Sequence, residues 1–556
     1  MNDDAERQEI ASQPFVPVCA IGASAGGVTA LQRLFRHLPP DLGLAYVVIL
    51  HLSPEQPSAL SEVLSLCTRM PVVQISDAPA LSPNCVLVIP PDRELIIDGD
   101  NVTARAFTEP RGHRLPIDTF FHSIAAGRGD GVAVILSGAG ADGALGVQSV
   151  KEAGGVIMVQ EPAEADFGSM PRAAIATGVV DFVAPLARLA ELLIEVARSK
   201  KAVRSLDMDG DANDLRRIVS FLRAQTGHDF SFYKRATVMR RVLRRVTVCR
   251  MDSLAAYADH LLATPEEAKE LLSDLLISVT MFFRDLHAFE ALERQAIKQL
   301  FDDSHPGTEK TIRVWVVGCA TGEEAYSVAM LLHEEATRRK LRPDVQIFAT
   351  DLDESALATA REGRYPRSIE ASVSEERLAR FFFDEGTHFR VRKELRDSVL
   401  FTSHSVIKEP PFIRLDLITC RNLLIYLERS LQQQVCSIFR YGLKPGGFLF
   451  LGSAETADVV PDLFVPLDRE ARIYRARPQV GHALPVLPQF AIAERPGGPD
   501  HSHAVRAPRA DLSASLHVSA LERCAPPNVL VDDRQNVLHL SPTAGRFMLL
   551  TAGPLS

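Results

Sequence analysis

A serine, a histidine and an aspartate in the first third of the chain have the spacing of a hydrolase triad. Ser24 lies in a G-x-S-x-G pentapeptide (22–26) between an apolar strand pattern and a helix pattern. His51 ends the next apolar run, and Asp142 follows a third one in a glycine-rich loop. At one edge of a parallel sheet they could act as nucleophile, general base and orienting carboxylate. The pentapeptide alone also fits a serine that caps a helix beside phosphate-binding glycines.

A second group of residues has the pattern of a cofactor site. An apolar strand (314–317) leads into a turn that contains Gly318 and Gly322, and the next strand ends at Asp351. An acidic residue at that position can bind ribose hydroxyls, so an NAD enzyme is one interpretation. Glu324, close to the turn, would repel a pyrophosphate but suits a cationic sulfonium. The pattern therefore favours S-adenosylmethionine.

Methyl transfer to a carboxylate depends on alignment, because a glutamate is already ionised at neutral pH. An arginine that holds the carboxylate and a tyrosine beside the methyl group are the groups to expect. Arg284 and Tyr426 are available for these roles. An ordinary Arg–Asp pair and core packing are the alternative interpretations of these two residues.

The elements that must position both groups form two separate α/β patterns. In each, short apolar strands alternate with helix-like stretches, which is typical of parallel sheets. The predicted segments are a disordered N-terminus (1–14), an α/β domain (15–198), a linker (199–214), a helical subdomain (215–285), a second, Rossmann-like α/β domain (286–477), a flexible linker (478–515) and a partial domain (516–556).

Composition and charge exclude several classes of protein. Hydrophobic residues make up 46% and charged residues 24% of the 556 residues, which indicates a soluble globular protein. The net charge of −9 argues against a general nucleic-acid binder. The eight cysteines form no C-x-x-C pair and no metal-like spacing, and no export signal or membrane-spanning run is present. We therefore expect a cytoplasmic protein without membrane insertion, with reduced thiols and no metal.

The first α/β pattern resembles the catalytic domain of bacterial chemotaxis receptor methylesterases. The motifs IGASAGG, LHLSP, LSGAGADG and VQEPAEADFGSMPRAAI carry the resemblance over roughly 15–197. It implies that Ser24 is the nucleophile, His51 the base and Asp142 the orienting acid. The implied reaction is hydrolysis of a glutamate γ-methyl ester, with glutamine deamidation as a further reaction. Ala139 stands where the family loop often has methionine.

The segment 214–477 resembles chemotaxis receptor glutamate methyltransferases. The motifs are LLISVTMFFRD, RVWVVGCATGEEAYSVAM, IFATDLD, PPFIRLDLITCRNLLIYL and LKPGGFLFLGSAET. The resemblance implies S-adenosylmethionine as cofactor and places Arg284 and Tyr426 nearest the chemistry. The implied cofactor-binding residues are Thr280, Arg284, Gly318, Glu324, Asp351, Ser405, Val406, Arg421 and Asn422. Ser405 stands where the family usually has asparagine, and Ser278 replaces an expected amide.

A basic stretch interrupts the acidic average of the chain. Its members are Lys234, Arg235, Arg240, Arg241, Arg244 and Arg245. An apolar stripe at helical spacing, from Met239, Val242, Leu243 and Val246, leaves the arginines on the other helix face. A solvated face and nucleic-acid binding are two general interpretations. The methyltransferase resemblance implies that this helix faces a glutamate-rich receptor helix, so we favour a protein partner.

The final residues, ERCAPPNVLVDDRQNVLHLSPTAGRFM, resemble the opening strands of a PAS sensor domain. Taken together, the sequence predicts a bifunctional enzyme that methylates and demethylates glutamates of a chemoreceptor or a related signalling protein. A catalytically weak scaffold that keeps both folds for binding is the alternative. Two opposed activities would consume S-adenosylmethionine without net effect, so we hypothesise that partner binding gates one domain at a time.

Overall fold

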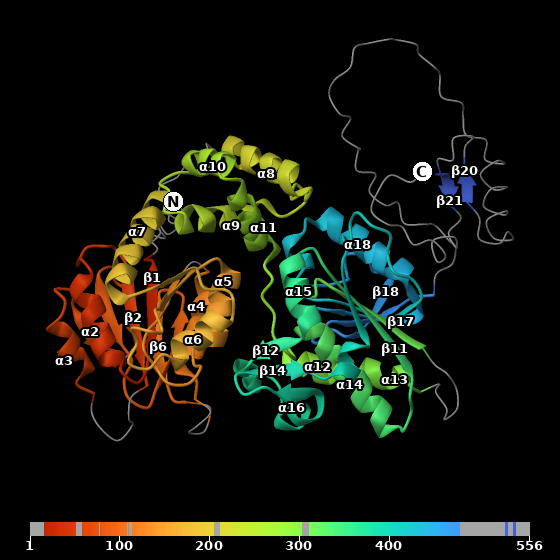
Figure 1. Ribbon diagram of the computed structural model, residues 1–556, viewed down its shortest axis with the longest axis horizontal. Helices are drawn as coiled ribbons and strands as arrows, with labels where there is room; N and C mark the ends of the chain where they lie inside the picture. Colours follow the sequence, from red (N-terminus) through yellow and green to blue (C-terminus); the bar gives the residue numbers. More distant parts are fainter. Residues whose placement is uncertain are drawn as a thin grey trace, which may run out of the picture. The chain divides into compact units, whose positions relative to one another are not determined.

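The computed structural model describes residues 16–51, 58–76, 78–107, 109, 114–129, 131–204, 212–302, 311–478, 529–531 and 537–540. The chain forms two compact units, Met1–Gln489 and Phe490–Ser556. Figure 1 colours the chain from red at the N-terminus to blue at the C-terminus. No helix in the described ranges is both long enough and apolar enough to cross a membrane.

The N-terminal α/β domain is built on a seven-stranded parallel sheet of order β3-β4-β2-β1-β7-β8-β9. Its strands are β1 (Val18–Ala23), β2 (Ala45–Leu50), β3 (Val72–Gln74), β4 (Cys85–Val88), β7 (Val132–Ile135), β8 (Val156–Gln160) and β9 (Phe182–Ala184). A hairpin pairs β5 (Glu94–Asp98) with β6 (Asn101–Arg105). The helices are α2 (Gly27–His37), α3 (Leu60–Ser65), α4 (Pro116–Gly127), α5 (Ala144–Ala153), α6 (Ser169–Ala176) and α7 (Leu186–Arg204).

Both faces of this sheet are buried, which explains the continuous apolar strands in the sequence. Successive residues of β1 belong to different cores: Cys19 and Ile21 pack in one, Val18 and Ala20 in the other. Alternation of side chains along a strand produces this division, and helices on both faces supply the partners. The predicted parallel α/β domain is therefore confirmed.

The helical subdomain consists of α8 (Ala212–Thr226), α9 (Arg235–Val248), α10 (Leu254–Ala263) and α11 (Pro265–Leu276). These helices share one apolar core, which includes the predicted stripe residues Met239, Val242 and Val246. The structure corrects the prediction for half of the basic stretch, because Arg241, Arg244 and Arg245 are buried, whereas Lys234, Arg235 and Arg240 are exposed. Carboxylates and carbonyls of neighbouring elements receive the donors of the buried arginines, which the spacing within α9 could not reveal.

The predicted linker at 199–214 differs from the structure at both ends. Helix α7 continues through it to Arg204, and α8 begins at Ala212. The Ser199 hydroxyl donates to the Met251 carbonyl at 2.6 Å, and Lys200 is buried, so the end of α7 packs against the helical subdomain. Lysine, arginine and alanine favour helix, and this tertiary contact stabilises a stretch that looks like a linker by composition.

The second α/β domain has a seven-stranded sheet of order β15-β11-β10-β16-β17-β19-β18. Its strands are β10 (Thr311–Val317), β11 (Asp344–Asp351), β15 (Val399–Ser403), β16 (Leu415–Cys420), β17 (Leu443–Leu451), β18 (Phe464–Asp468) and β19 (Ile473–Ala476). The first five are parallel neighbours, whereas β19 is antiparallel to both β17 and β18. A small sheet contains β12 (Arg364–Pro366), β13 (Phe382–Asp384) and β14 (His388–Val391).

The helices of this domain are α12 (Leu286–Leu292), η1 (Glu293–Ile297), α13 (Lys298–Leu300), α14 (Glu323–Arg338), α15 (Glu354–Glu362), η2 (Arg367–Ala371), α16 (Glu375–Phe381), α17 (Lys393–Arg396), η3 (Leu424–Tyr426) and α18 (Arg429–Gly442). The second unit shows one antiparallel strand pair, β20 (Val529–Val531) with β21 (Val537–Leu540). Most of the predicted PAS-like segment and of the linker 478–515 lies outside the described residues, as does the N-terminal segment 1–14. The PAS-like assignment therefore remains a prediction.

Trp315, the single tryptophan of the chain, lies fully buried in β10. Its indole N–H donates to the Thr350 hydroxyl on β11 at 2.9 Å, across a strand pair in which Trp315 faces Phe348 in register. A buried donor without an acceptor is costly, so this hydrogen bond fixes the packing of the two central strands.

We expect Thr350→Val to lower the free energy of unfolding of the second α/β domain by about 1–3 kcal/mol, because the Trp315 N–H loses its acceptor. Urea unfolding followed by tryptophan fluorescence reports on this domain directly. Thr402→Val on the neighbouring strand β15 is the matched control, with an expected change within about 0.5 kcal/mol. Equal midpoints for both variants would contradict a structural role for this hydrogen bond.

Candidate active sites

The three residues of the predicted triad lie after the carboxyl ends of parallel strands in the first domain. Strands β1 and β2 pair in parallel with Ala23 opposite Leu50, so Ser24 and His51 follow directly after paired residues. Strand β7 lies on the other side of β1, and the loop that follows β7 carries Asp142. Parallel strands thus place all three residues at one edge, as the sequence predicted.

Asp142 is held by the backbone at the N-terminus of α4. Its carboxylate oxygens accept the amides of Ile117 at 3.0 Å and Asp118 at 2.9 Å, and Oδ2 also meets His51 Nε2 at 2.7 Å. Because Asp142 engages Nε2, the nitrogen of His51 that remains to take a proton is Nδ1.

A second carboxyl lies behind this pair. Asp118 is buried and accepts the Gly146 amide at 2.6 Å. Burial, and then the charge of Asp142, raises the pKa of Asp118 well above its usual value. Asp142, and not Asp118, is the carboxyl group that contacts His51.

Ser24 is positioned by its backbone. Its amide donates to the Ser137 carbonyl at 3.0 Å, and Gly26 follows with φ of 72°, a left-handed conformation that suits glycine. Within the described residues, the Ser24 hydroxyl forms no hydrogen bond to His51, so the structure shows the His51–Asp142 pair, with Ser24 at the end of the neighbouring strand β1. The Ser24 amide is therefore already used, as is the amide of Gly27, the first residue of α2, which donates to the Ser24 carbonyl at 2.8 Å.

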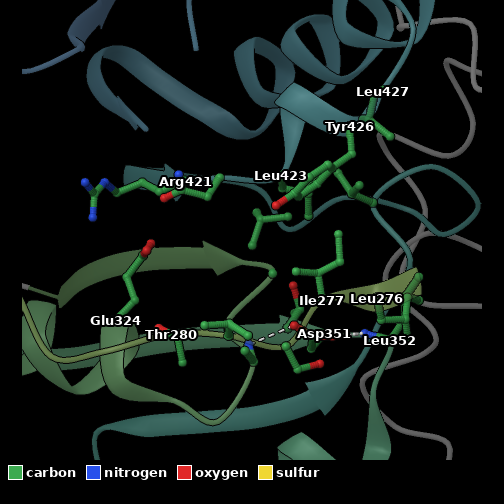
Figure 2. A pocket seen from close by; sticks show the side chains of 18 of the residues that line it. Leu276, Ile277, Thr280, Glu324, Asp351, Leu352, Arg421, Leu423, Tyr426 and Leu427 are labelled. Atoms are coloured by element: carbon green, nitrogen blue, oxygen red, sulfur yellow. Dashed lines mark hydrogen bonds between the residues drawn. The ribbon is translucent and has the colours of Figure 1, made fainter. Parts of the chain in front are cut away.

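All of the predicted cofactor residues of the second domain line one pocket, which has an empty volume of about 1010 Å³ including its open mouth. They are Thr280, Arg284, Gly318, Glu324, Asp351, Ser405, Val406, Arg421 and Asn422, and Tyr426 joins them. Figure 2 shows Thr280, Asp351 and Leu352 along one wall, with Leu423 and Tyr426 along the opposite wall. The pocket lies at the carboxyl ends of β10, β11 and β16, where open parallel sheets bind ligands.

Asp351 connects the glycine-containing turn to the second strand. Its carboxylate accepts the amides of Ala320 and Leu352, both at 2.7 Å, and of Asp353 at 3.0 Å. Gly318, with φ of 71°, begins the turn, and a Cβ there would lie 2.8 Å from Leu423 Cδ1. The turn therefore requires glycine at this position, and Asp351, held by three backbone amides, lines the pocket.

Glu324 adds a second acidic group to the pocket. It accepts the Thr419 hydroxyl at 2.6 Å, and burial raises its pKa, opposed by the nearby guanidinium of Arg421. With Glu152, three acidic side chains line the pocket, and together they disfavour a pyrophosphate and suit a cation. The residues thus fit a positively charged sulfonium with a ribose, and not the NAD alternative.

Arg421 holds residues of the pocket wall in place. Its guanidinium donates to the Arg284 carbonyl at 2.8 Å and to Asp285 at 2.6 Å, and it packs over the rings of Phe289 and Phe450. Only 1% of its side chain is exposed, and Figure 2 shows the guanidinium at the far end of an extended side chain. Arg421 thus fixes the backbone of Arg284 by direct contact.

Ser278 and Ser405, the two serines that differ from the residues usual in the family, line the pocket, and each hydroxyl has a hydrogen-bond partner. The Ser278 hydroxyl donates to Asp353 at 2.7 Å, and the Ser405 hydroxyl accepts the Lys408 amide at 3.3 Å. Three further residues escaped the sequence reasoning. Buried Glu455 accepts the amides of Asn422 and Ile425 and thereby shapes the pocket floor, Thr419 binds Glu324, and Glu152 reaches the pocket from the first domain. Only the GSAET motif hinted at Glu455.

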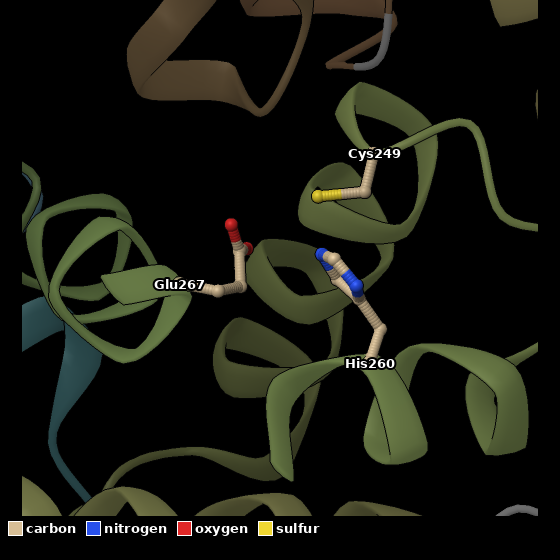
Figure 3. A group of neighbouring side chains, drawn as sticks. All are labelled: Cys249, His260 and Glu267. Carbon is tan, nitrogen blue, oxygen red and sulfur yellow. The ribbon is translucent and has the colours of Figure 1, made fainter. Parts of the chain in front are cut away.

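Three side chains of the helical subdomain, Cys249, His260 and Glu267, lie close enough to suggest a metal site (Figure 3). However, both Glu267 oxygens accept from Arg245, at 2.8 and 2.7 Å, and one also accepts the Tyr257 hydroxyl. Burial raises the pKa of Cys249 to about 11, so its thiol is protonated at neutral pH. A guanidinium in this place repels a divalent cation, and the cluster is a buried ion pair.

Comparison with known proteins agrees with this geometry. Residues 19–193 match the family model of CheB methylesterase, 213–276 the all-alpha domain of CheR methyltransferase, and 278–473 its SAM binding domain. The chain is 35% identical over 89% of its length to an uncharacterized 104.1 kDa protein in the hypE 3' region of Rhodobacter capsulatus. It covers 54% of that protein, so it spans about half of that relative's length.

Two further comparisons concern the single domains. The chemotaxis protein methyltransferase of Salmonella typhimurium is 32% identical, over 43% of this chain and 82% of that protein. The crystal structure of the Thermotoga maritima CheB methylesterase catalytic domain is 26% identical, covers 33% of this chain and 99% of that one, and gives a TM-score of 0.31.

The matched domains show that one chain contains a CheB methylesterase domain and the SAM binding domain of CheR methyltransferases. The chain belongs to the CheR family of chemotaxis protein methyltransferases. Its cofactor is S-adenosylmethionine.

We expect Asp351→Asn to weaken S-adenosylhomocysteine binding by at least about tenfold, because each lost charged hydrogen bond costs roughly 1.5–3 kcal/mol. Calorimetry on the purified chain measures this. Asp344→Asn at the opposite end of β11 is the matched control, because Asp344 lies outside the pocket. Equal affinities of the two variants for S-adenosylhomocysteine would show that Asp351 does not contribute to cofactor binding.

Proposed function

We propose that this protein is a bifunctional enzyme that methylates glutamate side chains of a chemoreceptor or related signalling protein and hydrolyses the resulting γ-methyl esters. The observation that carries the proposal is the single pocket that unites Arg284, Asp351 and Tyr426 at the sheet edge of a SAM-binding domain. The separate His51–Asp142 pair in a methylesterase domain supports the second activity.

In the methyltransferase site, the chain's residues bind and align. Asp351 accepts hydroxyls of the ribose, and Glu324 offers negative charge to the sulfonium. S-adenosylmethionine supplies an electrophilic methyl group when bound. Arg284 holds the acceptor carboxylate by charge, and Tyr426 lies beside it. Burial raises the pKa of Tyr426 to about 12, so its phenol is neutral at physiological pH and can donate a hydrogen bond. The pocket walls exclude bulk water from the carboxylate.

In the esterase site, His51 Nδ1 takes the proton of Ser24 as the hydroxyl oxygen attacks the ester carbonyl. Asp142 fixes the imidazole and stabilises its protonated form. The amides at the N-terminus of α2 stabilise the oxyanion, and methanol leaves with the proton from His51. Water then hydrolyses the acyl-enzyme and restores Ser24 and the glutamate carboxylate. Deamidation of glutamine by the same attack would release ammonia in place of methanol.

We expect Ser24→Ala to reduce methanol release from a peptide that carries a glutamate γ-methyl ester by about 10³-fold or more, because the nucleophile is lost. The same variant should bind S-adenosylhomocysteine with unchanged affinity. Asp351→Asn should show the opposite pattern, with intact ester hydrolysis and weak cofactor binding. Gas chromatography of methanol and calorimetry give the two readouts.

Ser65→Ala, an exposed substitution on α3, is the matched control and should alter neither activity. Full ester hydrolysis by the Ser24 variant would refute the proposed nucleophile. An unmodified chain that binds no S-adenosylhomocysteine would refute the methyltransferase part and leave the scaffold alternative.

A further inference from the structure

The arginines of α9 are bound to the first domain at the C-terminal end of α5. Arg241 donates to the carbonyls of Lys151, at 2.8 Å, and Glu152, and Arg244 donates to the Gly155 carbonyl at 2.9 Å. The last carbonyls of a helix carry partial negative charge and lack intrahelical partners. Cations from α9 thus cap α5, and this contact joins the methylesterase domain to the helical subdomain.

A charge network reinforces the contact. Arg244, with a fully buried side chain, pairs with Asp181 of the first domain at 2.5 Å and with Asp274 of α11. Lys151 of α5 pairs with the same two aspartates, at 3.4 and 2.8 Å. A guanidinium keeps its charge in proteins, so a buried arginine requires such partners. The network fixes the end of α5 beside the methyltransferase pocket.

The position of Glu152 follows from this contact. Its carboxylate lines the cofactor pocket together with Tyr426, and Arg284 Nη2 donates to its two oxygens at 2.8 and 3.0 Å. Arg284 is the residue expected to hold the carboxylate of the acceptor glutamate. A glutamate of the chain itself therefore makes the contact that a protein substrate would make.

We propose that Glu152 is an intramolecular competitor that occupies the acceptor-carboxylate position of the methyltransferase, so that docking of the methylesterase domain on α9 holds methylation off. This inference rests on the proposed function of the same pocket. The docking surface and the acceptor position are coupled, because Lys151 and Glu152 are adjacent on α5. A protein acceptor must displace Glu152 before its own carboxylate can reach Arg284, which reduces its apparent affinity.

Carboxyl footprinting of the full chain with a carbodiimide and glycine ethyl ester tests the contact without any acceptor. Glu152 should be labelled at least about fivefold more slowly than Glu191, whose side chain is 62% exposed. Arg284→Ala should abolish this protection, and mass spectrometry of the peptides reads both sites. Equal labelling of Glu152 and Glu191 in the unmodified chain would overturn the proposal.

Competition is tested by methyl transfer from S-adenosylmethionine to a synthetic helical peptide with adjacent glutamates. At peptide concentrations below KM, Glu152→Gln should raise the initial rate by about tenfold through a lower KM, with kcat unchanged. Glu191→Gln on α7 is the matched control and should leave the rate as it is. Equal rates for Glu152→Gln and the unmodified chain would overturn the competition.

Two measurements separate this inference from the proposed function. Calorimetric S-adenosylhomocysteine binding tests the pocket itself, and its loss would refute the proposed function. Intact binding together with an unprotected Glu152 would refute only the competitor. A methyl group found on Glu152 by mass spectrometry would show that this carboxylate reacts, and would also overturn its role as a competitor.

Discussion

The burial of permanently charged arginine side chains is the constraint on which the arrangement of this protein depends. Arg241 and Arg244 of α9 are almost fully buried, and neither can lose its charge. Loss of one partner from a buried ion pair costs about 3–5 kcal/mol, so carbonyls and carboxylates must surround them. The end of α5, with Asp181 and Asp274, meets that requirement. Glu152 lies at the methyltransferase pocket as a consequence.

Both candidate sites depend on carboxylates that the backbone holds. Asp142 accepts amides from the start of α4, Asp351 from the turn after β10 and from the residues that follow it, and Glu455 from the segment after β16. Backbone amides do not titrate, and tight turns place them firmly. Both domains thus hold a carboxylate with backbone amides at the carboxyl ends of parallel strands. In the first domain this carboxylate contacts an imidazole, and in the second it lies at the proposed cofactor site.

The two proposed activities would act on the same chemical group, a glutamate side chain in its charged and esterified forms. The methyltransferase pocket must attract a carboxylate, and any glutamate that is held near it becomes a ligand. Fusion to a methylesterase domain supplies such a glutamate at fixed distance. We hypothesise that partner binding allows only one of the two domains to act at a time. The contact of α5 with α9 is a structural element through which partner binding can have this effect.

The sequence by itself predicted the two α/β domains and the residues that line the pocket of the second one, because local patterns encode strand ends and glycine turns. Ser24, His51 and Asp351 each follow or end an apolar strand, and parallel pairing brings such ends together. Only the tertiary structure showed that Arg241, Arg244 and Arg245 of α9, which look solvent-facing by helical spacing, are buried, whereas Arg235 and Arg240 are exposed. Glu152 likewise carries no motif. Helical spacing shows which residues share a helix face, but it does not show which element packs on that face. Charge pairing between residues far apart in the sequence therefore decided which element packs on α9 and which carboxylate reaches Arg284.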